Sequence, residues 1–259
     1  MYLTSLYIRL FKFIINKISK TKKLFYLGTE YGGWHFIHDE NLENSLMISA
    51  GVGEDISFDI EMINKYKIKV ILIDPTPRSV EHINKVSKSL GKSNTKEFLD
   101  GGSQPIEAYN LKDVNKNDFT LIKKALFNKS NQIVKFFEPP NADHVSHSIS
   151  NWQNDFKKES KFIEVETISI SDIVNLYNID NIPLLKLDIE GAEIEVVNDM
   201  LKNKILPKQL LVEFDELYKN SLKGYLRATY IFFKLLINGY KLIKTNKFPN
   251  FLFVSTKVN

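Results

Sequence analysis

The sequence predicts an α/β fold built on a mostly parallel sheet with an antiparallel strand at its C-terminal end. Three observations predict it. Short apolar runs alternate with stretches of helical periodicity from residue 46 onward. Turns containing glycine or proline end these runs, and the last two runs lie close enough in the chain to pair antiparallel. Strand–helix–strand units of this length imply parallel strands joined by right-handed crossovers.

Each element follows from its own pattern. Strands are predicted where a short run is apolar and β-branched, and helices where apolar residues recur three and four apart. Residues 91–118 are polar, have few apolar anchors and predict no regular element. The predicted strands are residues 46–50, 70–73, 119–127 (one strand or a pair), 133–137, 162–168, 184–187, 209–214, 240–244 and 251–255. The predicted helices are residues 56–66, 79–90, 171–177, 192–201 and 226–238.

Composition indicates one domain in residues 23–259. The chain has 259 residues, is 43% hydrophobic and carries no linker or repeat, so one sizeable core is expected. The net charge of +4 is spread along the chain, which gives no case for nucleic-acid binding. The absence of cysteine excludes disulfides, cysteine-based zinc sites and a cysteine nucleophile, and fits a cytoplasmic location.

Residues 1–22 are predicted to form a separate amphipathic helix. Cations interrupt its apolar face, so it cannot span a bilayer, and it lacks the small-residue cleavage site of a signal peptide. Two interpretations stay open: residues 1–20 lie on a membrane surface, or the helix packs on the domain or on a second subunit as a homodimer. We favour packing, because most such stripes are buried faces. The apolar positions are Leu3, Leu6, Tyr7, Leu10, Phe11, Ile14 and Ile18, and the cations are Arg9, Lys12, Lys17 and Lys20.

A ligand site is expected at the carboxyl ends of the strands, where open α/β sheets bind their ligands. Gly51 and Gly53 follow the first strand and let the backbone approach a ligand at a helix N-terminus. Asp74 ends the next strand, where its carboxylate could accept hydrogen bonds from both hydroxyls of an adenosine ribose. This pattern predicts a nucleoside-containing cofactor.

The glycine turn alone does not separate two cofactors, a dinucleotide and S-adenosylmethionine. The dinucleotide fingerprint requires a third glycine, and its position holds Ile56. Glu54 and Asp55 would repel a pyrophosphate, whereas S-adenosylmethionine has no phosphate and carries cationic groups. The acidic loop therefore favours S-adenosylmethionine over a nicotinamide dinucleotide.

The most informative motif covers residues 184–193, at the end of a predicted strand. Lys186 and Asp188 point the same way because strand side chains alternate, and Glu190 follows just past the strand end. Ionisable groups at the end of an apolar strand are costly unless they are hydrogen-bonded or functional. The alternative to a functional role is a structural one, in which these residues form a salt bridge and a helix-capping acid.

This motif (Lys-Leu-Asp-Ile-Glu-Gly-Ala-Glu, residues 186–193), with residues 165–173 before it and 211–214 after it, resembles the FkbM-type methyltransferase family. The resemblance covers roughly residues 45–255 and implies a Rossmann-like class I methyltransferase fold. It also implies S-adenosylmethionine-dependent O-methylation, often of sugars or polyketide-type products. Residues 31–34 and 74–77 are similar to a subset found among bacterial surface-glycan genes. The chain departs from the family at Ser49, where many related enzymes have an acid near the cofactor amino group; Glu54 or Asp55 could replace it.

The candidate site residues follow from these patterns. An alcohol acceptor must lose its proton, so a general base is expected among Asp188, Glu190, His144 and His147. Two histidines with Asp188 could bind a metal, but their spacing does not demand one and none is predicted. Candidate cofactor residues are Tyr31, Ala50, Gly51, Gly53, Asp55, Asp74, Pro75, Thr76 and Ala125. Candidate acceptor residues are Lys186, Trp152 and Asn151, with Trp34, Gln153 and Tyr109 also available for polar or stacking contacts.

The sequence therefore predicts an S-adenosylmethionine-dependent O-methyltransferase that acts on a sugar hydroxyl of a bacterial surface glycan or its precursor. Two alternatives from other classes remain: an NAD-dependent oxidoreductase, and a non-catalytic module that keeps the cofactor-binding fold. A titration with both cofactors discriminates the oxidoreductase from the methyltransferase, whereas the fold alone never establishes activity.

Overall fold

Seven strands form the central sheet, in the order β11-β12-β10-β9-β3-β4-β5. The computed structural model describes residues 2–141, 145–151, 153, 154, 157, 159–245 and 247–257. Strands β3, β4, β5, β9 and β10 run parallel, whereas β12 runs antiparallel to both β10 and β11. The predicted mostly parallel α/β sheet with an antiparallel C-terminal strand is confirmed. The sheet strands are β3 (Leu46–Ala50), β4 (Lys69–Ile73), β5 (Phe119–Ile122), β9 (Leu184–Leu187), β10 (Gln209–Glu213), β11 (Tyr240–Ile243) and β12 (Asn250–Ser255).

The strand order reverses at β3. The chain leaves β3 toward β4 and β5 on one side, then returns to place β9 and β10 on the other. In such sheets, the crevice outside the carboxyl ends at the reversal is where ligands bind. The carboxyl ends of β3 and β9 therefore mark the expected site, and both strands carry the motifs singled out in the sequence.

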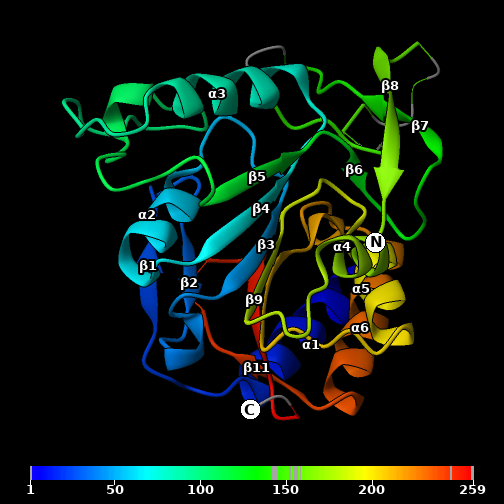
Figure 1. The fold of residues 1–259 in the computed structure, drawn as a ribbon. Coiled ribbons are helices and arrows are strands. Elements are labelled where there is room, and N and C mark those ends of the chain that lie inside the picture. Colours follow the sequence, from blue (N-terminus) through cyan, green and yellow to red (C-terminus); the bar gives the residue numbers. More distant parts are fainter. Residues whose placement is uncertain are drawn as a thin grey trace.

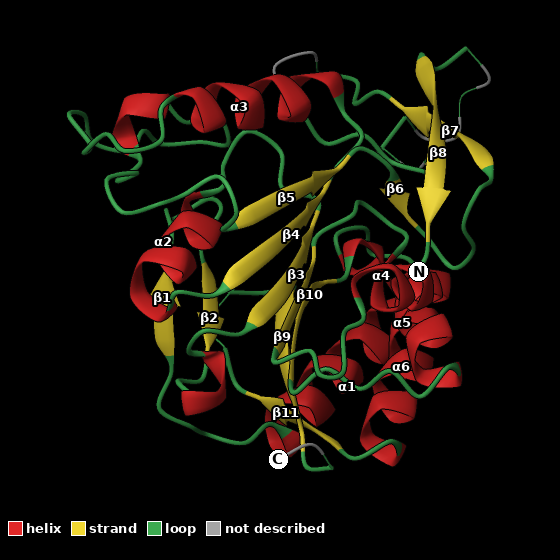
Figure 2. Ribbon diagram, in the orientation of Figure 1, coloured by secondary structure: helices red, strands yellow, loops and turns green. Residues whose placement is uncertain are grey.

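Helices cover both faces of the sheet, which makes three layers (Figures 1 and 2). One face carries α2 and α3, and the other carries α1, α4, α5 and α6. Each layer buries its own apolar cluster against the sheet. The helices are α1 (Tyr2–Ile18), α2 (Ser57–Tyr66), α3 (Pro77–Lys88), α4 (Ile170–Tyr177), α5 (Glu193–Lys202) and α6 (Leu222–Ile237), and the short 3₁₀ turns are Glu40–Leu42, Ile106–Ala108 and Asp215–Leu217.

Because side chains alternate along a strand, successive residues of β3 and β9 face opposite helix layers. Ile48 and Ala50 pack toward the α5–α6 layer, so Ser49 between them faces the α2 layer. Lys186 pairs with Ser49 across the β3–β9 ladder and faces the same way. A serine and a lysine therefore lie inside an apolar layer, immediately below the carboxyl edge of the sheet.

Two small sheets were not expected from the sequence. Strands β1 (Phe25–Leu27) and β2 (Trp34–Phe36) pair antiparallel beside α2. Strands β6 (Ala125–Leu126), β8 (Phe162–Ile168) and β7 (Ile133–Phe137) form a separate sheet. The run predicted at residues 119–127 is thus two strands in different sheets, because β5 pairs with β4 whereas β6 pairs with β8.

Helix ends follow local capping signals. Pro77 starts α3 two residues earlier than the predicted residue 79, because its fixed φ suits the first helical position. Ser221 caps α6 by accepting the Gly224 N–H at 3.3 Å, so this helix begins at Leu222 rather than at residue 226. None of the described helices combines the length and hydropathy needed to cross a membrane.

Candidate functional site

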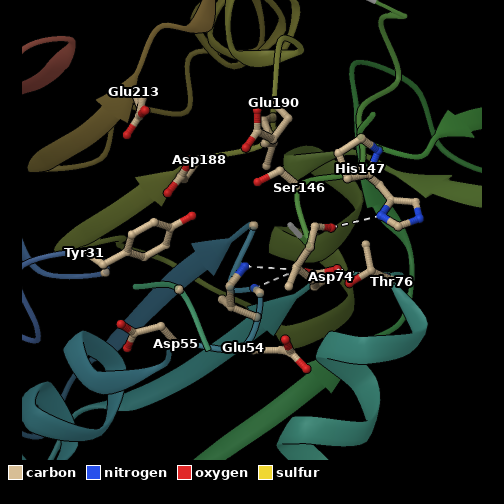
Figure 3. A pocket seen from close by; sticks show the side chains of 18 of the residues that line it. Tyr31, Glu54, Asp55, Asp74, Thr76, Ser146, His147, Asp188, Glu190 and Glu213 are labelled. Atoms are coloured by element: carbon tan, nitrogen blue, oxygen red, sulfur yellow. Dashed lines mark hydrogen bonds between the residues drawn. The ribbon is translucent and has the colours of Figure 1, made fainter. Parts of the chain in front are cut away.

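A cavity of about 1190 Å³ opens at the carboxyl edge of the central sheet. Its wall includes the ends of β3, β4, β9 and β10, together with loops from the small sheets and from the C-terminal hairpin. This volume exceeds the roughly 300–1,000 Å³ of a typical small-molecule pocket, so it has room for two ligands side by side. Figure 3 shows carboxylates entering the cavity from several of these elements.

The glycine turn after β3 forms part of the wall. Gly51 has φ +70°, and a Cβ there would lie 1.5 Å from the Asp188 carbonyl oxygen. Only glycine allows this approach of β3 to the β9 end. Gly53 has φ +56°, and a Cβ there would meet nothing within 4 Å, so its Cα side faces open space. The turn is therefore closely packed against the sheet at Gly51, and its backbone is exposed to the cavity at Gly53.

Asp74, at the end of β4, clamps this turn. Its Oδ2 accepts the N–H groups of Val52 at 3.2 Å and Gly53 at 3.0 Å. Its Oδ1 accepts both the N–H and the hydroxyl of Thr76 at 2.8 Å. A carboxylate offers about four acceptor positions, so the side chain is fully used within the protein. A ligand hydroxyl would reach this carboxylate only by replacing one of these four bonds.

The two other acids of the glycine loop are also engaged. Asp55 is buried, accepts the Thr29 hydroxyl at 2.5 Å and accepts the Ser57 N–H at 2.9 Å. It thereby joins the loop before β2 to the start of α2. Glu54 forms an ion pair with Arg78 of α3 at 2.5 Å. Tyr31 follows Thr29 and enters the cavity beside the Asp188 side (Figure 3).

Lys186 supports the turn from below. It is 4% exposed, and its Nζ donates to the Gly51 carbonyl at 2.8 Å. The same ammonium lies 3.9 Å from Asp188 Oδ2 and 5.6 Å from the centre of the Trp34 ring. A lysine rarely lies this deep unless it is paired. Lys186 thus ties β9 to the glycine turn and supplies positive charge behind Asp188.

Three carboxylates gather at the end of the cavity formed by β9 and β10, which we call the acidic end. They are Asp188, Glu190 and Glu213 (Figure 3). Burial raises the pKa of Asp188, and Lys186 partly offsets the rise. Burial, with the nearby Asp188 charge, raises the pKa of Glu190 to about 7 and that of Glu213 to about 8. Perturbed carboxylates facing a cleft are candidates for proton transfer.

Hydrogen bonds orient two of these acids. Gln153 donates to Glu190 Oε2 at 2.9 Å, and the Tyr218 hydroxyl donates to Glu213. Asp188 has no such bond to another side chain among the described residues; its cationic neighbours are Lys186, at 3.9 Å, and Lys247. Asp188 is therefore the acid whose oxygens remain available to a ligand.

The backbone of the loop after β9 is held in a sparsely populated conformation. Glu190 has φ +59° and Gly191 has φ +100°. The buried Glu193 accepts the Ile189 N–H at 2.9 Å and the Gly191 N–H at 3.0 Å. A left-handed non-glycine residue persists only where its surroundings fix it, and such residues cluster at functional sites.

A second cation on the cavity wall, Lys247, comes from a turn about sixty residues after Lys186 of β9. Lys247 lies in the turn between β11 and β12 and donates to the Glu30 carbonyl at 2.9 Å and the Tyr31 carbonyl at 2.8 Å. Burial lowers the pKa of Lys247, while Glu213 and Asp188 act in the opposite direction. Lys247 therefore joins the C-terminal hairpin to the Tyr31 loop at the acidic end.

Most of the predicted site residues meet at this cavity. Asn151 is an exception: its amide donates to the Lys157 carbonyl at 2.8 Å and the Ser160 hydroxyl at 3.0 Å, away from the described wall. Ala50 is buried in β3, where its carbonyl accepts the Asp188 N–H at 3.1 Å. His144 and Trp152 lie outside the described residues. The predicted residues on the wall are Tyr31, Gly51, Gly53, Glu54, Asp55, Asp74, Pro75, Thr76, Ala125, His147, Gln153, Lys186, Asp188 and Glu190.

Three further predicted residues, His147, Trp34 and Tyr109, differ in their positions relative to the cavity. His147 lies at the end of the cavity opposite Tyr31 and Glu213 (Figure 3), with Nδ1 2.9 Å from the Val145 carbonyl. Trp34 and Tyr109 are buried, and the Tyr109 hydroxyl accepts the Ile56 N–H at 3.2 Å, so both belong to the core. No group of three or more histidine, aspartate or glutamate side chains that could hold a metal occurs in the described part of the chain.

Sequence reasoning missed several wall residues. Glu213 lies in a motif that the resemblance contains, and an acid at the end of an apolar strand was a usable signal. Lys247 and Phe248 come from a polar hairpin turn with no motif, and Asp100 comes from a segment that predicted no element. These residues join the site only through the tertiary fold.

The fold and the site together define a Rossmann-like domain with a ligand cavity at its switch point. The model of the methyltransferase FkbM domain family matches residues 29–226. The chain belongs to the FkbM methyltransferase family. The match begins after α1 and contains the glycine turn, Asp74 and the motif of residues 184–193.

The chain is also similar to a solved structure, the methyltransferase FkbM of Methylobacillus flagellatus KT. The two share 15% sequence identity at a TM-score of 0.43, over 85% of this chain and 45% of that one. This chain thus spans less than half the length of that protein. No curated protein sequence matches the chain.

Proposed function

We propose that this methyltransferase transfers the methyl group of S-adenosylmethionine to a hydroxyl oxygen of a bacterial surface glycan or its precursor. The observation that carries the proposal is the position of Asp188. Its available carboxylate, with a raised pKa, lies between the glycine turn and the acidic end of the cavity. That is where a general base is needed when an alcohol attacks a methyl donor held on the turn.

The residues present fit S-adenosylmethionine. The bare Gly53 backbone gives a ligand access to the turn, and the cavity wall beyond it is acidic, which suits a sulfonium and an ammonium group. The turn, Thr76 and Ala125 would hold the adenosine portion, and the Asp188 end would face the sulfonium. When bound, the cofactor supplies an electrophilic methyl group on a neutral leaving group. Asp74 supports the turn through four internal bonds, so ribose recognition would involve an exchange at Thr76.

The chain's own residues then have two tasks. Asp188 accepts the proton of the acceptor hydroxyl, and its raised pKa strengthens it as a base relative to an exposed aspartate. Lys186 fixes the turn and stands 3.9 Å from Asp188, so it stabilises the carboxylate before it takes the proton. Holding the nucleophile close and in line supplies much of the remaining acceleration.

The acidic end supports a polyhydroxyl acceptor. Glu190 and Glu213 can accept hydrogen bonds from hydroxyl groups, and Gln153 and Tyr31 add neutral polar contacts. A phosphate-rich part of an acceptor would be repelled by Asp188, Glu190 and Glu213 whenever they are ionised, so we place it outside this end of the cavity. The acceptor group that enters is thus an uncharged sugar ring.

The alternative of an NAD-dependent oxidoreductase gains no support. Ile56 is fully buried at the position of the third glycine, and the family match concerns methyltransferases. A non-catalytic module differs from an enzyme only in turnover, which binding experiments cannot see.

The test is a calorimetric titration with S-adenosylmethionine, S-adenosylhomocysteine and NADH, with and without magnesium, followed by transfer of a labelled methyl group to a panel of glycans. We expect binding of the first two ligands alone and label on a hydroxyl. NADH binding would overturn the cofactor assignment. Cofactor binding with no transfer to any glycan, amine or phenol would favour the non-catalytic module.

A further inference from the structure

An apolar surface with cationic edges lies on the outer side of α1 and α6. The Tyr7 hydroxyl donates to the Thr229 hydroxyl at 2.8 Å, so the two helices lie side by side. Phe11 of α1 packs edge-on against Tyr225 and Phe232 of α6, and no element among the described residues covers the outer sides of the two helices. We call this outer side the α1–α6 face.

Large apolar side chains of both helices point outward there. On α1, Leu10 and Ile14 lie three and seven residues from Tyr7 and share its side of the helix. On α6, Leu226 and Phe233 lie three and four residues from Thr229, on the side next to α1. The two stripes therefore border one seam. Their exposed fractions are Leu6 54%, Leu10 50%, Phe13 61% and Ile14 41% on α1, and Leu222 38%, Leu226 49%, Tyr230 53%, Phe233 58% and Ile237 79% on α6.

The charged residues of α1 and α6 themselves have one sign. The sequences of α1 and α6 contain no aspartate or glutamate, and residues 1–23 contain none either. Arg9, Lys17 and Lys223 are exposed on the two helices, and the Lys17 ammonium lies 5.5 Å from the centre of the Phe13 ring. Lys20, Lys22 and Lys23 continue the positive charge past the end of α1. Apolar and aromatic residues between cations are typical of helices that bind at a lipid interface.

We propose that the α1–α6 face binds the surface of a membrane rich in anionic phospholipids. The apolar stripes would enter the headgroup boundary while the surrounding lysines and arginine meet lipid phosphates. A second copy of the chain is a poorer occupant, because a twofold contact would bring two acid-free, cationic faces together. This proposal does not depend on the reaction proposed above.

The face is connected to the cavity wall. The Lys12 ammonium, on the other edge of α1, lies 4.8 Å from the centre of the Phe248 ring, and Phe248 lines the cavity. A protein docked through α1 would therefore hold the acidic end of its cavity close to the lipid surface. Acceptors carried on a membrane lipid would meet the cavity there.

The test is co-sedimentation of the full chain with vesicles of phosphatidylcholine alone and of phosphatidylcholine mixed with phosphatidylglycerol. We expect binding only to the mixed vesicles, with a loss at high salt because screening weakens the lipid–lysine attraction. The double variant Phe13→Glu, Phe233→Glu should bind at least about tenfold more weakly, since two aromatic groups no longer enter the interface. Ile133→Glu, at a 66% exposed apolar position on β7, should bind as the parent chain does.

Two further measurements are needed. Thermal unfolding checks that each variant is folded. If the Phe13→Glu, Phe233→Glu variant is unfolded, the double variant Lys17→Glu, Lys223→Glu takes its place in the vesicle experiment. Sedimentation velocity without lipid reports self-association. Absence of binding to both vesicle types overturns the proposal, as does equal binding by the parent and both double variants. A dimer that these substitutions dissociate would instead assign the face to a second copy.

Discussion

The Lys186 ammonium donates to the carbonyl oxygen of Gly51 at 2.8 Å, so a buried lysine on β9 stabilises the turn that follows β3. A hydrogen bond to a charged group is worth about 1.5–3 kcal/mol. Lys186→Met should lower the free energy of unfolding by about that amount. It should also weaken cofactor binding, because the turn loses its support. Urea unfolding and calorimetry measure both effects. The control is Lys241→Met, which removes an exposed lysine from β11; equal losses in both variants would contradict the assigned role.

The two glycines of the turn should respond very differently to a methyl group. In Gly51→Ala the Cβ would meet the Asp188 carbonyl oxygen at 1.5 Å, so β3 and β9 must separate. In Gly53→Ala the Cβ meets nothing, and the cost is the left-handed backbone, about 1–2 kcal/mol. We expect insoluble or strongly destabilised Gly51→Ala and a folded Gly53→Ala with weaker cofactor binding. Thermal unfolding and titration distinguish them; a stable Gly51→Ala would show that this approach is not required.

Variants of Asp74 and Thr76 test what governs cofactor affinity: the hydrogen bonds by which Asp74 holds the glycine turn, or a direct contact with the ligand. Asp74→Asn replaces an acceptor oxygen by a donor and should loosen the turn, so cofactor affinity should fall by about ten- to a hundredfold. Thr76→Val removes one of four bonds to Asp74 and frees an acceptor position. We expect a change of less than about threefold in that variant. If both variants lose affinity equally in calorimetry, the Thr76 hydroxyl itself contacts the ligand.

Asp188→Asn should separate binding from turnover. The amide keeps the side-chain size but cannot take the acceptor proton, and general bases contribute about a hundred- to ten-thousandfold in rate. We expect kcat to fall within that range while cofactor affinity changes little. His147→Asn should retain most of the turnover, because His147 lies at the opposite end of the cavity from Glu213 and Tyr31. The reverse order of effects in single-turnover measurements would transfer the role of base to His147.

Glu213 should make the stability of the protein depend on pH. Burial and the Asp188 charge raise the pKa of Glu213 from its ordinary 4.5 to about 8. The folded state therefore favours the protonated acid, and this contribution to stability is full below about pH 4.5 and is lost progressively as the pH rises from there through about 8. Glu213→Gln removes that loss, so the variant should melt above the parent near about pH 9 and not near about pH 4. Thermal unfolding at both values measures the difference; an equal offset at both would contradict it.

The sequence predicted those parts of the fold that depend on local pattern. β-branched runs identified the strands of the central sheet, and the glycine turn, Asp74 and Asp188 identified its ligand edge. The small sheets were not predictable in the same way. β6 has two residues, and its partner β8 lies some forty residues further along, so no local periodicity reports the pairing.

The candidate site was predictable where residues stand at strand ends. Lys186 was expected to face an acceptor, but strand alternation and depth place its ammonium on the Gly51 carbonyl. Lys247 reaches the cavity from a turn more than two hundred residues after Tyr31, whose carbonyl it binds. Such contacts depend on long-range packing that a single sequence does not encode in any short window.

The buried Glu193 has a consequence for how this site can change. Its carboxylate holds the N–H groups on either side of Glu190, whose backbone is left-handed at φ +59°. The direction of the Glu190 side chain is thus determined by a residue with no surface of its own. Selection or engineering for a new acceptor could leave every cavity residue untouched and still redirect the acidic end by altering this one hidden carboxylate. Conversely, acceptor preference can be kept only while position 193 keeps a side chain that accepts both bonds.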